Sequence, residues 1–315
     1  MSGAADSAAE MQAAVEDPLP TTDALCALVK ASDNVAACSE LLHLRPEILK
    51  GKDEQGITPL HWATLPMRMR CLELFTTLGS PIATPAADTG MLPFHWVCTT
   101  KQVNTVRYLH DLGCEIDCLD AKGRSPLAHA ARCGCTSVVY YLLAQGANPS
   151  LVDCHGDSAW HWGAYQNSEP VLKVLASFGT SDHAACDSFG QNALHLAAGQ
   201  GARAAVTFLL TISEAPEMLL VKDKQGRTPL AMAQARNQSA TVELLRQFQP
   251  SAVMDTQNQL LSWTNYLTFS WGNFVGAINY RTDTFSRWID RTAEAYKSAS
   301  AAPKSAAPAS AAPKS

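Results

Sequence analysis

Short apolar runs at helical spacing recur along most of the chain, and a polar turn that contains a glycine precedes each run. In one run, Val138, Val139, Leu142 and Leu143 form a single apolar face, and Gly146 ends the run. Such a run predicts a short helix that is buried on one side. The repeated order of turn, helix and second helix predicts an all-α chain.

Six stretches share one motif of turn and helix start. They read DEQGITPLHWA from Asp53, ADTGMLPFHWV from Ala87, DAKGRSPLAHA from Asp120, DCHGDSAWHWG from Asp153, DSFGQNALHLA from Asp187 and DKQGRTPLAMA from Asp223. Their glycines stand at positions 56, 90, 123, 156, 190 and 226. One unit of this length cannot bury its own apolar faces, so the units are expected to stack into a solenoid.

Each residue type in the motif has a physical role. The glycine permits a tight turn after the aspartate. A proline at the first helical position costs no hydrogen bond, and it occurs at Pro59, Pro93, Pro126 and Pro229. The fifth unit carries the extra residues TISEAPEMLLVK, which predict a longer finger, meaning the projecting turn with the glycine, or a longer turn before it.

The chain before the repeats is of two kinds. Residues 1–20 are small, acidic and turn-rich, a composition typical of disorder. Residues 21–52 predict two short helices without the motif, hence a divergent N-terminal cap of a repeat domain over residues 21–250. The candidate N-caps are Thr22 or Asp23 for the first helix and Asp33 or Asn34 for the second.

After Pro250 the pattern changes again. Residues 251–297 predict an aromatic amphipathic helical segment, and residues 298–315 form a low-complexity Ala/Pro/Lys/Ser tail. The segment either caps the open end of the solenoid, contacts a membrane interface or docks on another protein. Its candidate residues for contact with a membrane or a partner are Trp263, Trp271, Phe274 and Trp288.

Composition excludes several classes of function. The net charge is −5 and no basic stripe occurs, which argues against a nucleic-acid partner. The N-terminus lacks the apolar core of a signal peptide, and no 18-residue apolar run predicts a transmembrane helix. The ten cysteines are therefore expected to be reduced thiols. The protein itself is expected to be cytoplasmic, either free in the cytoplasm or peripheral to a membrane.

The repeat length and the Thr-Pro-Leu-His-x-Ala pattern resemble the ankyrin repeat. TPLHWAT at 58–64, HWVCTT at 95–100 and WHWGAYQN at 160–167 resemble, more closely, the ankyrin domain of the ankyrin-repeat DHHC-type palmitoyltransferases. This resemblance implies a module that recruits substrates by binding short extended peptides. It implies a groove tryptophan at Trp96, and it places Pro66 where the family has a groove asparagine.

The catalytic half of those enzymes has no counterpart in this sequence, which lacks an Asp-His-His-Cys motif. We therefore predict no catalytic residue, no cofactor and no metal site. Cys114, Cys118, Cys133 and Cys135 lie close in sequence but contain no Cys-x-x-Cys pair, so ordinary thiols are favoured over a zinc site.

The motif histidines His61, His95, His161 and His195 are expected to bond the backbone of a neighbouring repeat. The tryptophans that follow them have two interpretations, inter-repeat core or exposed groove. We assign Trp62 and Trp162 to the core and Trp96 to the groove.

The repeat pattern also predicts which residues face a partner. The candidate partner-binding residues are Leu65, Pro66, Met91, Trp96, Thr99, Arg132, Tyr165, Gln166 and Phe189. Ile57, Arg124, His155 and Gln200 belong to the same predicted surface. This surface is mixed in chemistry and carries little charge, which suits a peptide or protein and argues against a phosphate-rich ligand.

The leading prediction is a non-catalytic adaptor that binds an extended peptide or protein partner on its concave face. The alternatives are an accessory or substrate-recruiting component of protein S-palmitoylation and a membrane-surface scaffold. The sequence does not specify an oligomeric state.

Overall fold

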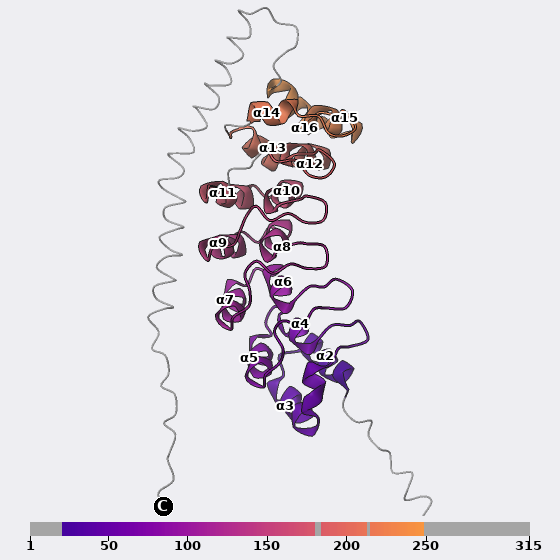
Figure 1. Ribbon diagram of the computed structural model, residues 1–315, viewed down its shortest axis with the longest axis vertical. Coiled ribbons are helices and arrows are strands. Elements are labelled where there is room, and N and C mark those ends of the chain that lie inside the picture. Colours follow the sequence, from indigo (N-terminus) through magenta and orange to yellow (C-terminus); the bar gives the residue numbers. More distant parts are fainter. Residues whose placement is uncertain (1–20, 180–183, 213–214, 249–315) are drawn as a thin grey trace, which may run out of the picture. The chain divides into compact units, whose positions relative to one another are not determined.

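The computed structural model describes residues 21–179, 184–212 and 215–248, and its regular elements there are helices (Figure 1). This agrees with the predicted all-α class. The predicted segments 1–20, 251–297 and 298–315 lie outside the described residues. So do Trp263, Trp271, Phe274 and Trp288.

The described part begins with the predicted helix pair, α2 (Thr22–Ala31) and α3 (Val35–Leu44), followed by the 3₁₀ helix η2 (Pro46–Lys50). Thr21 caps α2 by accepting the Ala24 N–H at 3.3 Å, so the predicted caps Thr22 and Asp23 are wrong by one or two residues. The cap is the last extended residue, and Thr22 is already helical. Asn34 caps α3, as predicted.

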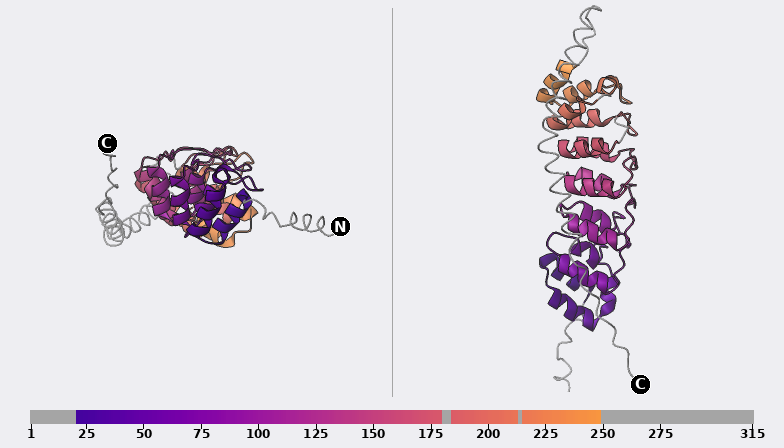
Figure 2. Two further views of the ribbon diagram at one scale, coloured as in Figure 1. Left: turned by 90° about the horizontal axis from the view of Figure 1, so that it is seen from below. Right: turned by 90° about the vertical axis from the view of Figure 1, so that its left-hand side faces the viewer.

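Six helix pairs follow in the predicted order. We call the first helix of each pair inner and the second outer. The pairs are α4 (Pro59–Ala63) with α5 (Met69–Thr77), α6 (Pro93–Cys98) with α7 (Val103–Asp111), α8 (Pro126–Arg132) with α9 (Thr136–Ala144), α10 (Ala159–Tyr165) with α11 (Glu169–Ser177), α12 (Ala193–Gln200) with α13 (Arg203–Leu209), and α15 (Pro229–Ala235) with α16 (Ser239–Phe248). Successive pairs stack on one another (Figure 2). The expected solenoid of six repeats with a divergent N-terminal pair is confirmed.

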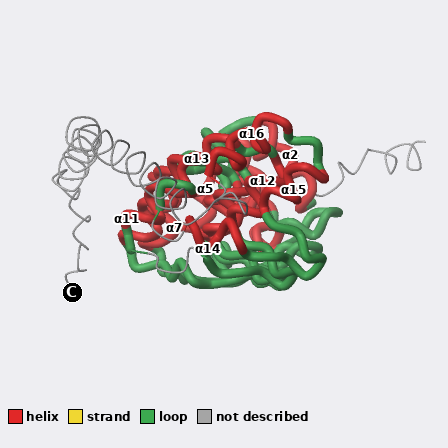
Figure 3. The backbone as a smooth tube through the Cα atoms, turned by 90° about the horizontal axis from the view of Figure 1, so that it is seen from above, coloured by secondary structure: helices red, strands yellow, loops and turns green. Residues whose placement is uncertain are grey.

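The fingers gather along one side of the inner helices (Figure 3). Every finger but the second is closed by its first aspartate, as in repeat three, where Asp120 Oδ1 accepts the N–H groups of Lys122 and Arg124 at 2.8 and 2.9 Å. Gly123 adopts φ +73°, a conformation that other residues rarely reach. A backbone bond from Cys154 N to Lys122 O at 2.8 Å ties this finger to the next.

The core runs through the stack, between inner and outer helices and between successive repeats. Leu127 of α8, Leu142 of α9 and Leu172 of α11 are fully buried or nearly so. Burying each such side chain contributes about 1.5–3 kcal/mol. No single repeat encloses these residues, so the stability of each pair depends on its neighbours.

The extra residues of repeat five form a short helix, α14 (Ala215–Leu220), and not a longer turn or finger. Met218 and Leu219 are buried, and Asn192 Nδ2 donates to the Met218 carbonyl at 3.0 Å. The insertion becomes helical because it has two apolar residues to bury against the stack.

Candidate functional site

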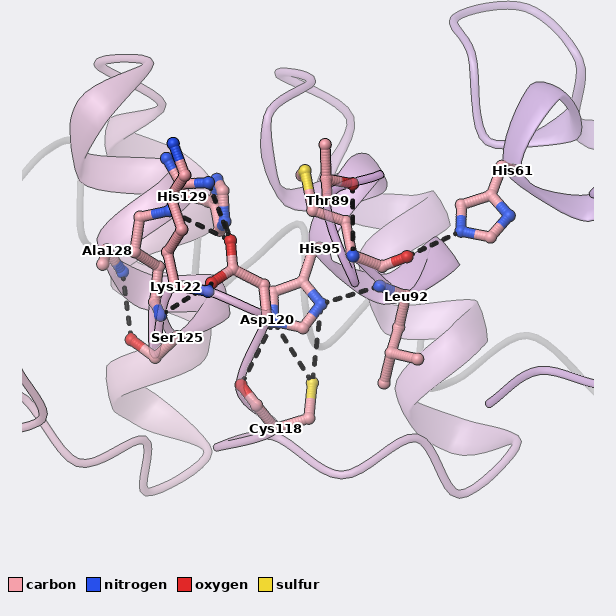
Figure 4. Close-up of polar contacts among 12 residues, drawn as sticks. His61, Thr89, Leu92, His95, Cys118, Asp120, Lys122, Ser125, Ala128 and His129 are labelled. Atoms are coloured by element: carbon pink, nitrogen blue, oxygen red, sulfur yellow. Dashed lines mark hydrogen bonds and ion pairs between the residues drawn. The ribbon is translucent and has the colours of Figure 1, made fainter. Parts of the chain in front are cut away.

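The inner helices carry a ladder of buried histidines. The Nε2 atoms of His61, His95, His161 and His195 lie 2.9, 3.2, 3.1 and 3.0 Å from backbone carbonyls of the next repeat. Figure 4 shows His95 between Leu92 of its own repeat and Cys118 of the next. The predicted structural role of these histidines is confirmed, so they are not candidates for catalysis.

Repeat three departs from this ladder. Ala128 holds the histidine position, and His129 stands one residue later (Figure 4). His129 Nε2 lies 3.0 Å from Asp120 Oδ2, and Arg124 forms an ion pair with the same oxygen at 2.8 Å. The predicted groove residue Arg124 is therefore held by its own finger.

The position after the motif histidine forms a row along the inner helices, which we call the inner row: Trp62, Trp96, His129 and Trp162. Trp96 is half-buried, as expected. Trp62 and Trp162 are also half-buried, so their assignment to the core is wrong. The indole of Trp62 donates from Nε1 to Asp53 Oδ2 at 2.9 Å, which places its polar edge at the base of the finger.

The ring of Trp96 is held between its neighbours. Its centroid lies 5.2 Å from that of Trp62 and 5.3 Å from that of His61, both in edge-on geometry. In the second finger Ala86 takes the place of the aspartate, because Ala86 N pairs with Met91 O as Asp53 N pairs with Ile57 O. The motif in the sequence predicts Ala87 at this position, which is wrong by one residue. Trp96 thus lacks the carboxylate that Trp62 has.

A pocket of about 200 Å³ opens beside Trp96, between the first and second fingers. It is lined by Gln55, Ile57, Ala86, Asp88, Thr89, Met91, Trp96 and Thr99. The structure therefore brings together three predicted partner-binding residues, Met91, Trp96 and Thr99. Sequence reasoning missed Gln55 of the first finger and Ala86, Asp88 and Thr89 of the second. The extra residue in the second finger was the available signal for the last three.

Three further predicted residues gather in repeats three and four. The Arg132 guanidinium carbon lies 6.0 Å from the ring centroid of Trp162, and the Tyr165 ring lies 5.9 Å from it. Tyr165 is 39% exposed, and Gln166 beside it is exposed as the C-cap of α10. These residues form a second contact surface, separate from the pocket lining.

The remaining predicted residues stand apart. Leu65 is half-buried and Pro66 is exposed after α4, and neither lines the pocket. Phe189 is 55% exposed in the fifth finger, where its ring lies 6.1 Å from that of His155. The binding role of all these residues stays a prediction.

Two of the four cysteines considered as zinc ligands are held as neutral thiols by burial. Burial raises the pKa of Cys114 to about 11 and that of Cys118 to about 12. A raised pKa disfavours the thiolate that metal binding needs. Within the described residues no cluster of histidine, cysteine or acidic side chains is placed to hold a metal ion.

The described helices are all too short or too polar to span a bilayer.

Stacked helix pairs with projecting fingers and half-buried tryptophans along the inner helices define a repeat protein built for contact with other molecules. The family model for ankyrin repeats in three copies matches residues 70–153, 94–183 and 160–257, and the chain belongs to this family.

Three similar proteins illustrate its relatives. Palmitoyltransferase ZDHHC13 of Mus musculus is 26% identical over 226 residues, which are 70% of this chain and 36% of that protein. B-cell lymphoma 3 protein of Homo sapiens is 32% identical over 163 residues, or 50% of this chain and 36% of that protein. Probable 26S proteasome regulatory subunit p28 of Saccharomyces cerevisiae is 27% identical over 149 residues, or 45% of this chain and 64% of that protein. The chain thus spans about a third of the length of the first two, and the ankyrin repeats are a protein-interaction module.

Proposed function

We propose that this chain is a non-catalytic adaptor that binds an extended segment of a partner protein along its fingers and inner row. The single observation that carries the proposal is the pocket beside Trp96. Its lining includes Ile57, Met91 and Trp96. An aliphatic or aromatic side chain of the partner fits such a pocket, and a large rigid indole is a frequent centre of binding energy.

Charge supports a protein partner over a nucleic acid. Asp88 is the charged residue of the pocket lining, and the whole chain carries a net charge of −5. A nucleic-acid site needs several cations on one face. The neighbouring surface at Arg132, Trp162 and Tyr165 mixes one cation with two aromatic rings, which suits a polypeptide.

The test is a selection of random twelve-residue peptides on the full chain, followed by titration of the selected peptides. Trp96→Ala should weaken their binding by about thirtyfold or more, because truncating an aromatic anchor typically costs about 2 kcal/mol. Circular dichroism should show that the variant stays folded, since Trp96 is half-buried and not part of the fully buried core.

Phe178→Ala is the matched control. Phe178 is an aromatic residue that is 41% exposed beyond the outer helix α11, remote in sequence from the pocket lining. Its removal should leave peptide affinity unchanged. Undiminished binding by a folded Trp96→Ala protein would remove Trp96 from the site, and loss of its fold would return the residue to the core.

A second candidate function is recruitment of substrates for protein S-palmitoylation. It is favoured by the alignment with palmitoyltransferase ZDHHC13, which covers 70% of this chain. On this hypothesis the chain co-purifies with a membrane acyltransferase and adds no palmitate by itself. Palmitate transfer by the pure chain, or failure to co-purify, would contradict it.

A membrane-surface role for residues 251–297 is a separate proposal. It predicts that the full chain floats with liposomes and that replacing Trp263, Trp271, Phe274 and Trp288 by serine abolishes flotation. Flotation that is unaffected by these changes would contradict the role.

A further inference from the structure

Several half-buried arginines of this chain have an acceptor within it. Arg124 and Arg227 pair with the aspartates of their own fingers at 2.8 Å. Arg68 donates from Nε and from a terminal nitrogen to backbone carbonyls at 2.7 and 3.1 Å, and Arg45 lies 2.8 Å from a glutamate oxygen. A half-buried guanidinium has lost part of its hydration, and such an acceptor replaces it.

Arg132 is also half-buried, at the end of α8, and it lacks an acceptor. Within the described residues no hydrogen bond or ion pair reaches its guanidinium. Its Nε is buried without a partner and is therefore closed to a ligand. The two terminal nitrogens are not buried, so they are the donors that a ligand can reach.

Two aromatic rings of the next repeat position this guanidinium. Its carbon lies 6.0 Å from the centroid of the Trp162 ring, and α8 and α10 pack side by side (Figure 1). The Tyr165 ring lies 5.9 Å from that of Trp162 in edge-on geometry, and this tyrosine is 39% exposed. A guanidinium held over an indole keeps its N–H groups in its own plane, where a ligand can bind them.

A carboxylate is the acceptor that matches this donor. Its two oxygens take two parallel N–H bonds from a guanidinium, and the pair is charge-assisted, whereas a backbone carbonyl offers one uncharged oxygen. The surroundings add a second cation, because Lys101 is exposed on the loop after α6. Burial raises the pKa of Cys135, three residues beyond Arg132, to about 11, and the charge of Lys101 opposes that rise. Both cations favour an anion on this edge of the inner helices.

We propose that Arg132, positioned by Trp162, forms a subsite for an aspartate or glutamate side chain of the bound partner, with the Tyr165 ring as the apolar contact beside it. The inference rests on the adaptor function proposed above and adds the charge of the partner to it. The partner segment thus supplies the anion that Arg132 lacks within the described chain.

The place of this subsite sets a pattern in the partner. Trp96 of the pocket lies on α6, and Arg132 and Trp162 lie on the next two inner helices, α8 and α10. Packed helices lie about 8–10 Å apart, and an extended chain rises about 3.3 Å per residue. An apolar residue in the pocket and a carboxylate at Arg132 should therefore stand about three to six residues apart in the partner.

The experiment repeats the selection of random twelve-residue peptides with the full chain and with Arg132→Gln, followed by titration of synthetic peptides with amidated C-termini. Peptides selected on the wild type should carry an apolar and an acidic residue at this separation, and Arg132→Gln should keep the apolar preference alone. An acidic peptide should bind the variant at least about tenfold more weakly, because a close charge pair is lost. Its form with the acidic residue changed to the amide should bind both proteins alike. Amidation of the C-terminus excludes the terminal carboxylate as the anion.

Arg132→Met, which removes every donor, serves if Arg132→Gln does not fold. Arg246→Gln, which changes an exposed arginine in the last turn of α16, is the matched control and should select the same peptides as the wild type. An apolar preference without an acidic one on the wild type would overturn the subsite and leave the adaptor function standing. An acidic preference that persists on both Arg132 variants would place the carboxylate elsewhere and also overturn it. Absence of any selected peptide would instead count against the adaptor function itself, and against the subsite with it.

Discussion

Single residues decide whether the carboxylate of a finger is paired with a cation of the same repeat. Asp120, held by Arg124 and His129, has a pKa lowered to about 2, because hydrogen bonds from its finger and its partners outweigh its burial. Asp157, in the position of Arg124, has its pKa moved in the opposite direction. Repeat four thus has an acidic side chain where repeat three has the arginine that pairs with its finger aspartate.

Leu127 tests the packing at this scale. It is 1% exposed in α8, a helix that contacts α6, α9 and α10. Leu127→Ala should lower the free energy of unfolding by about 2–5 kcal/mol, because it leaves a cavity that the stack cannot fill. Urea unfolding followed by circular dichroism measures the change.

Leu112→Ala is the control for that experiment, because Leu112 is 43% exposed at the end of α7. Its effect should stay well below that of Leu127→Ala. Equal effects of the two substitutions, or an unchanged midpoint for Leu127→Ala, would contradict the described packing.

At the scale of elements, the fingers are stacked and not merely parallel. Ser188 N donates to His155 O at 2.7 Å, which ties the fifth finger to the fourth. Gly156 stands at this contact with φ +81°, and a Cβ there would lie 3.0 Å from Ser188 N. Glycine is thus required both by its own conformation and by the neighbouring finger.

Substitution of two glycines by alanine distinguishes the conformational requirement from the requirement for space beside the next finger. Gly146 has φ +90° but nothing within 4 Å of an added Cβ, so Gly146→Ala should cost about 1–2 kcal/mol of conformational strain alone. Gly156→Ala should cost more, because the added methyl group also pushes the fingers apart. Urea unfolding of the two variants measures both, and equal costs would show that the finger contact contributes nothing.

The elements could be predicted from the sequence where glycine, proline and histidine recur at fixed positions. The helix α14 could not, because its residues were interpreted as an insertion into a turn, and only burial of Met218 and Leu219 makes them helical.

The pocket residues Met91, Trp96 and Thr99 were predicted from their positions within the repeat. Trp62 and Trp162 were not placed on the surface, although they hold the register position of Trp96. The Trp62 indole bonds Asp53 of its finger and the Trp162 indole nitrogen has no hydrogen-bond partner, contacts that the repeat pattern does not specify.

On the scale of the whole array, the histidine ladder links repeats one, two, four and five each to the next repeat through neutral imidazoles. The Leu92 N–H donates to His95 Nδ1 at 3.1 Å, and the Ser158 N–H donates to His161 Nδ1 at 3.3 Å. A backbone N–H can only donate, so Nδ1 is the acceptor and Nε2 carries the proton that bonds the next repeat. A second proton on Nδ1 would oppose that N–H, so protonation loosens contacts both within and between repeats.

The array should therefore lose stability on mild acidification. Burial lowers the pKa of His61 and of His129 from 6.5 to about 4, and it lowers the pKa of His95, His161 and His195 as well. The unfolded chain binds these protons first, so stability is full above pH 6.5 and falls as the pH drops toward 4. His61 and His129 each contribute up to about 3 kcal/mol to this loss. The raised pKa of Asp157 acts in the opposite direction, but it is one partly exposed group against five buried ones.

The midpoints of urea unfolding measured from pH 7.5 to 4.5 should decline steadily. The variant His43→Gln, which changes an exposed histidine, should show the same decline. A midpoint that holds constant or rises over this range would mean that the buried imidazoles accept protons in the folded array.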